Sequence, residues 1–161
     1  MAGGPIHPFS EYPTGSGAFP YIYQGGGANS KHERTLGIKA SLDADVAWRL
    51  RFSLPPALPA SGTFKLRLRA LANATSGVAK VNAKWASVAP EESPSAAALD
   101  AEGTTTVTWG AGDADQYKEA KVVLDAGTPV SGEVVVMDLV FETASWTLAA
   151  ISGWQPELIW E

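Results

Sequence analysis

The sequence of 161 residues contains no cysteine and only two histidines. Without cysteine, the chain has no disulfides, no thiolate nucleophile and no cysteine-ligated zinc site. His7 and His32 both fall outside the predicted strands and lack the spacing of metal ligands. A Ser-His-Asp triad needs a histidine held by a rigid scaffold, so we expect no catalytic residues, no metal and no cofactor.

Long apolar runs and helical periodicity are also missing. No apolar segment approaches the roughly 20 residues that a membrane-spanning helix needs, and the first thirty residues lack the pattern of a secretory signal. We therefore expect no membrane contact. The apolar content of 45% and charged content of 18% are ordinary for a globular chain, and 16 glycines with 11 prolines suit many turns between short strands.

The most apolar stretch, residues 132–142, organises the rest of the chain. Alternate residues of a strand point to opposite faces, and here both faces are apolar apart from Asp138. A strand of this kind is central and covered on both sides. One cover is the domain's own core, and the other is either the chain's own N-terminal arm or another subunit. The two faces are Val135, Met137, Leu139 and Phe141, and Val134, Val136, Asp138 and Val140.

Similar alternation recurs from residue 36 to the C-terminus, with turn signals at short intervals. In three predicted strands a tryptophan lies on the same side as the apolar residues, so we expect it in the core. These residues are Trp48, Trp85 and Trp109. Eight or nine short strands predict an all-β, antiparallel β-sandwich of jelly-roll type over residues 34–161. An immunoglobulin-like sandwich is the alternative, although its Cys-Trp-Cys core is absent.

Residues 1–33 read as an extended arm, rich in Gly and Pro and without strand or helix period. A plain disordered tail is poor in aromatic residues, whereas this segment has five. We interpret them as anchors that bind grooves on a partner. The other interpretation is an arm folded back on its own domain. The predicted anchors are Phe9, Tyr12, Phe19, Tyr21 and Tyr23.

Charge is divided unevenly along the chain. Residues 1–90 have ten Lys/Arg and four Asp/Glu, and residues 91–161 have two and thirteen, within a net charge of −5. This asymmetry indicates either a charged partner or two sides of one solvated surface. If their strands are neighbours, six basic residues form a basic outer face that suits an acidic protein partner better than nucleic acid. They are Lys39, Arg49, Arg51, Lys65, Arg67 and Arg69.

Two further chemistries remain open. Exposed aromatic rings stack on sugars, so Trp146, Trp154 and Tyr117 are candidate platforms of a carbohydrate-binding module. Asp113 and Asp115 form a carboxylate pair in a Gly-rich loop. That pair suits an acidic turn better than a hydrolase or a calcium site, because the full spacing of a calcium loop is absent.

An aromatic, proline-rich arm on a cysteine-free β-sandwich resembles the jelly-roll structural proteins of tailed-phage virions. The segments 64–75 and 81–90 look like units of such proteins. The resemblance implies a virion location, self-association, often as trimers, and attachment to coat protein, with no catalytic residues.

Together these patterns favour a non-enzymatic capsid decoration protein. It attaches to coat or neighbouring virion subunits through residues 1–33 and self-associates as a homo-oligomer, with no nucleic acid and no membrane partner. A carbohydrate-binding module is the alternative. The predicted self-association residues are Val134, Val136, Val140, Trp146, Trp154 and Trp160.

Overall fold

The computed structural model describes residues 10–14, 21–24, 34–39, 45–57, 63–93, 98–99, 101–124 and 130–161. Within these ranges the regular structure is almost entirely β, and no helix is long and apolar enough to cross a membrane. The elements are β1 (Ser10–Thr14), β2 (Tyr21–Gln24), β3 (Arg34–Lys39), β4 (Val46–Ser53), β5 (Phe64–Ala72), β6 (Gly77–Val88), β7 (Ala101–Trp109), β8 (Gln116–Val123), β9 (Val134–Phe141), the 3₁₀ turn η1 (Thr143–Ser145), β10 (Ala150–Ile151) and β11 (Gly153–Trp160).

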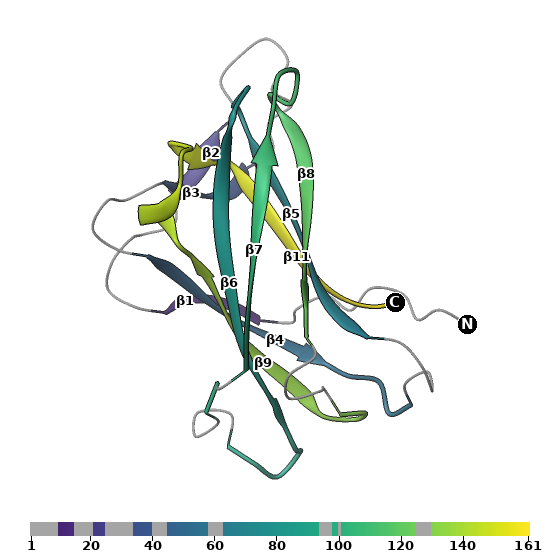
Figure 1. The fold of residues 1–161 in the computed structure, drawn as a ribbon. Helices are drawn as coiled ribbons and strands as arrows, with labels where there is room; N and C mark the ends of the chain where they lie inside the picture. Colours follow the sequence, from purple (N-terminus) through teal and green to yellow (C-terminus); the bar gives the residue numbers. More distant parts are fainter. Residues whose placement is uncertain are drawn as a thin grey trace.

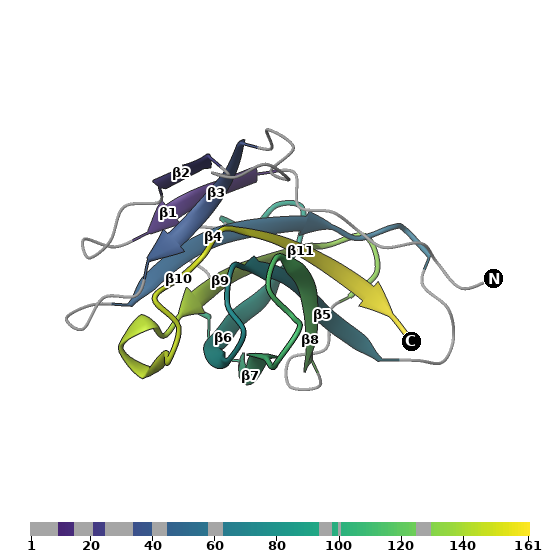
Figure 2. The same cartoon turned by 90° about the horizontal axis from the view of Figure 1, so that it is seen from above.

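The strands form an antiparallel jelly-roll sandwich, which confirms the predicted fold class. One sheet has the order β1-β4-β9-β6-β7, and the opposing sheet has the order β11-β5-β8. A third, smaller sheet of β10-β3-β2 lies at one end (Figure 1). The chain crosses between the two main sheets from β4 to β5, from β5 to β6, from β7 to β8 and from β8 to β9. Sequence neighbours therefore often lie in different layers (Figure 2).

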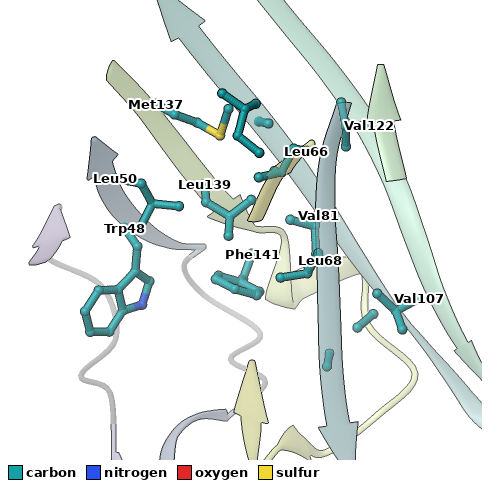
Figure 3. Packing of buried hydrophobic residues seen from close by; sticks show 14 of the residues in the cluster. Trp48, Leu50, Leu66, Leu68, Val81, Val107, Val122, Met137, Leu139 and Phe141 are labelled. Carbon is teal, nitrogen blue, oxygen red and sulfur yellow. The ribbon is translucent and has the colours of Figure 1, made fainter. Parts of the chain in front are cut away.

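The core lies between the two main sheets. It forms because every second residue of a strand points inward, and most of these inward residues are apolar. On β5 the burial alternates without exception, and its inward residues are buried against those of β9. Trp48, Trp85 and Trp109 are buried, as their parity predicts. Figure 3 shows side chains from β4, β5, β6 and β9 pointing into this shared layer. Burial of large apolar side chains at roughly 25 cal/mol per Å² is the main stabilising term of the fold.

Strand β9 is central, as predicted, with β4 on one side and β6 on the other. Its inward residues are fully buried. On the outward face, Val136 is also fully buried, and Val134 and Val140 are half-buried. This cover exists within one chain, so the burial of Val136 does not require a second subunit. Self-association through this face stays a prediction.

The described parts of the N-terminal segment pair with the domain's own strands. β1 pairs with β4, with Tyr12 opposite Arg49, and β2 pairs with β3, with Tyr21 opposite Gly37. These pairings correspond to the folded-back alternative. Phe9 and Phe19 lie outside the described residues, so partner binding through the arm stays a prediction.

Two strands contain a glycine at a paired position. β7 begins at Ala101 and pairs Gly103 with Ala83, and β11 begins at Gly153, which pairs with Leu71. Between β9 and β11 the chain forms η1 and the two-residue strand β10. Glycine weakens a strand interior, but at these two positions the backbone pairing continues through it.

The close approach of β7 to β8 requires a glycine at position 103. Gly103 points inward, and a Cβ at this position would lie 2.6 Å from Cγ1 of Val122 and 3.5 Å from the carbonyl oxygen of Val123. Val122 is buried and β-branched, so its side chain has few rotamers available. Any side chain at position 103 would therefore force the two strands apart.

We expect Gly103→Ala to lower the free energy of unfolding by about 1–3 kcal/mol, the usual effect of overpacking. Chemical denaturation of the purified protein measures this value. Gly110→Ala is the matched control, since its Cβ would come no closer than 3.6 Å to Asp113, and it should be nearly neutral. Equal stability of both variants would show that β7 and β8 do not approach this closely.

Candidate functional site

The six predicted basic residues do not form one face. Lys39 lies on β3, Arg49 and Arg51 on β4, and the other three on β5, so they belong to three different sheets. The prediction of a single basic outer face is therefore wrong. It required β4 and β5 to be neighbours, but the chain changes layer between them.

The outward face of β5 is neutralised by its neighbours. β5 lies between β8 and β11, which both come from the acidic half of the sequence. Across the three strands, Glu119 is opposite Arg69, and Glu157 is opposite Arg67. Basic residues from the first half of the sequence are thus paired to a large extent with acidic residues from the second half, within one chain.

The ion pairs on this face are close. Nε of Arg67 donates to Glu157 at 2.7 Å, and Nε of Arg69 donates to Glu119 at 3.2 Å. Nη1 of Arg69 also lies 3.7 Å from the Glu157 carboxylate. Glu157 is only 7% exposed, so its pairing with arginine satisfies a buried charge that would otherwise be costly.

Glu161 joins β5 and β8 at the other end of this face. Its carboxylate accepts hydrogen bonds from Lys121 at 2.7 Å and from Lys65 at 3.0 Å. The hydrogen bond from Lys121, followed by that from Lys65, lowers the pKa of Glu161 from 4.5 to about 2. The backbone of Glu161 also pairs with Thr63.

This pKa predicts a dependence of stability on pH. The pKa of Glu161 is lower in the folded protein than in the unfolded chain. The ion pairs of Glu161 therefore contribute fully to stability above about pH 4.5, and this contribution is lost as pH falls through about 2. Glu161→Gln should therefore be less stable than the natural protein at pH 7, with the difference disappearing near pH 2. Urea unfolding across this range tests it, with the exposed loop change Glu91→Gln as control. A difference that is independent of pH would contradict the ion pairs.

The C-terminal tryptophans pack inside the domain. Trp146 is buried against Phe141, and its indole N–H donates to the carbonyl oxygen of Lys80 at 2.9 Å. Trp154 makes edge contacts with Trp48 and Phe141 at centroid distances of 5.4 and 5.2 Å. The burial of Trp146 argues against a sugar-stacking role for it, whereas Trp154 is half-buried and its role as a platform stays a prediction. Trp160 is half-buried and packs on Phe64 at 4.5 Å.

Tyr117 is different, because 42% of it is exposed, and it is the only exposed aromatic residue in the part of the chain whose burial is described. It lies on β8, an edge strand of the β11-β5-β8 sheet (Figure 1). Leu71 of β5 is its register partner and is half-buried. The next row of the same face contains Glu119, Arg69 and the exposed Gln155. We call these five residues the Tyr117 surface.

The Tyr117 surface combines an aromatic ring with fixed polar groups. Its two rows are about 7 Å apart along the strands, and neighbouring strands are about 5 Å apart. Arg69 contributes donors, Glu119 contributes acceptors, and Gln155 contributes both. The Arg69–Glu119 ion pair restrains both side chains, so less ordering is needed when a ligand binds. Sequence reasoning identified Tyr117 but could not place the other four residues beside it.

The predicted carboxylate pair lies in the turn between β7 and β8. Asp113 accepts a hydrogen bond from the backbone N–H of Gly110 at 2.7 Å, and Nζ of Lys118 lies 3.0 Å away. These two groups, the backbone hydrogen bond first, lower the pKa of Asp113. The ammonium group of Lys118 thus already pairs with the Asp113 carboxylate. Across the described ranges, no group of three or more His, Asp or Glu residues is placed to hold a metal.

The outward face of the five-stranded sheet is also internally paired. Arg49 of β4 donates two hydrogen bonds of 2.6 Å to Asp138 of β9. On the other side of β9, Lys84 of β6 is the register partner of Asp138. Lys84 in turn lies 3.6 Å from Glu102 of β7. Charges therefore alternate across four strands. The described side chains of this face include no exposed aromatic residue.

No protein-family model matches the sequence, and a search of curated proteins finds no relative. Among solved structures, TmCBM61 in complex with β-1,4-galactotriose is 14% identical, with 96% of this chain and 91% of that chain covered and a TM-score of 0.45. A family 11 carbohydrate-binding module of a Clostridium thermocellum cellulosomal cellulase is 13% identical, with 100% and 97% covered and a TM-score of 0.49.

The enzymatically active domain of tailspike protein 4 from bacteriophage CBA120 is 11% identical, with 94% of this chain but 19% of that chain covered and a TM-score of 0.42. At these identities and TM-scores, a likeness carries no information about ligand or activity. Only the side chains of this chain therefore bear on its function.

Proposed function

We propose that the protein is a non-catalytic carbohydrate-binding module and that its ligand binds at the Tyr117 surface. The observation that carries the proposal is the position of Tyr117, exposed on a sheet face and bordered by Leu71 and the Arg69–Glu119 ion pair. A pyranose ring has an apolar C–H face and a rim of hydroxyl groups. The aromatic ring and Leu71 suit the first, and the polar row suits the second.

Charge pairing supports a binding role over acid–base catalysis at this surface. A glycosidase needs two carboxyl groups that face each other across the scissile bond. The two carboxylates of this region, Glu119 and Glu157, are instead both held by Arg67 and Arg69. Carboxylates held in this way can accept hydrogen bonds from sugar hydroxyls.

The alternative function, a virion structural protein, depends on self-association and on the arm. Of its supporting residues, Trp146 is buried within the domain, and Phe9 and Phe19 lie outside the described residues. The mass of the purified protein in solution distinguishes the two functions. A trimer would favour the virion protein, and a value near 16.9 kDa would favour the binding module.

Binding is tested by calorimetric titration of the full chain against a panel of neutral gluco-, xylo-, manno- and galacto-configured hexasaccharides. Tyr117→Ala should weaken the affinity about tenfold or more, which corresponds to about 1.4 kcal/mol. Tyr117→Phe keeps the ring and should retain most of the affinity.

Val123→Ala is the matched control for this experiment. Val123 lies on the same outward side of β8 and is 45% exposed, but it is at the opposite end of the strand. The change should leave binding unaltered. Full affinity in Tyr117→Ala, or no binding of any oligosaccharide to the natural protein, would refute the proposal.

A further inference from the structure

Among the described side chains beside Tyr117, each cationic group lies close to a carboxylate. Arg69 is 37% exposed and contacts two carboxylates, Glu119 at 3.2 Å and Glu157 at 3.7 Å. Arg67 contacts the same two acids. Two guanidinium groups and two carboxylates thus form one neutral cluster, with Glu119 as its more exposed acid at 39%.

The remaining charged groups near this cluster are also paired. Lys121 lies 2.7 Å from Glu161 and 4.0 Å from Glu119. Lys118, next to Tyr117 in sequence, lies 3.0 Å from Asp113. An anionic ligand at the Tyr117 surface would therefore meet the Glu119 carboxylate without gaining a free cation.

A sugar hydroxyl has no such conflict, because it both donates and accepts hydrogen bonds. It can donate to Glu119 and accept from Arg69 without separating the ion pair. A uronate carboxylate only accepts, and it would have to displace Glu119 from Arg69 against like-charge repulsion.

We propose that the Tyr117 surface binds neutral glycans and that Glu119 is the specificity-determining residue that excludes acidic ones. The inference depends on the proposed function, since it names the ligand class of the same site. Rejection of a wrong partner by a like charge is a common source of specificity.

The test compares the natural protein with Glu119→Gln, which keeps the shape of the side chain and removes its charge. The probes are the neutral hexasaccharide that binds best and two acidic hexamers, oligogalacturonate and oligoglucuronate. The natural protein should bind the neutral probe and show no measurable affinity for the acidic ones. Glu119→Gln should bind at least one acidic probe with an affinity at least tenfold above the detection limit of the titration, because Glu119 no longer competes for Arg69.

Glu102→Gln is the matched control, since it changes the net charge by the same amount on the other sheet, where Glu102 is exposed and lies 3.6 Å from Lys84. It should not gain affinity for acidic probes. If the natural protein binds uronates as tightly as neutral sugars, or if Glu119→Gln gains nothing, the inference is overturned while the proposed function stands. If no sugar binds, the proposed function fails and the inference fails with it.

Discussion

The pairing of β5 with β8 and β11 brings glutamates against its basic residues, and the rest of the structure is built on this contact. Three outward basic residues of one strand would repel each other if they were left beside neutral neighbours. β8 places Glu119 against them, β11 places Glu157, and Glu161 follows directly after β11. Exposed ion pairs contribute little individually, but this set forms a network, and the nearly buried Glu157 requires its arginines.

The same pairing connects the fold to the candidate site. Antiparallel register places Tyr117 opposite Leu71 and places Glu119 opposite Arg69 on the same outward face. The ion-paired row is therefore held at a fixed distance from the aromatic ring by backbone hydrogen bonds. A sheet face positions side chains more precisely than a loop does, and the proposed selection of a ligand at the Tyr117 surface requires this precision.

Sequence alone predicted the sandwich and much of its core, because parity along one strand depends only on residue spacing. Trp48, Trp85 and Trp109 lie in the core for that reason. Strand partners could not be predicted, because register between strands distant in sequence leaves no local pattern. The basic face failed at this step, since the layer change between β4 and β5 separates Arg51 from Lys65. Tyr117 was identifiable by type, but Arg69 and Gln155 became its neighbours only through β5 and β11.

In the proposed function, one sheet face built from three distant segments binds a neutral sugar. Amide chemical shifts of the ¹⁵N-labelled full chain, followed during titration with a neutral hexasaccharide, locate the bound sugar. The largest shifts should occur together at Leu71, Tyr117, Glu119 and Gln155. Shifts concentrated on the five-stranded sheet, around Asn82 and Thr104, would contradict binding at the Tyr117 surface.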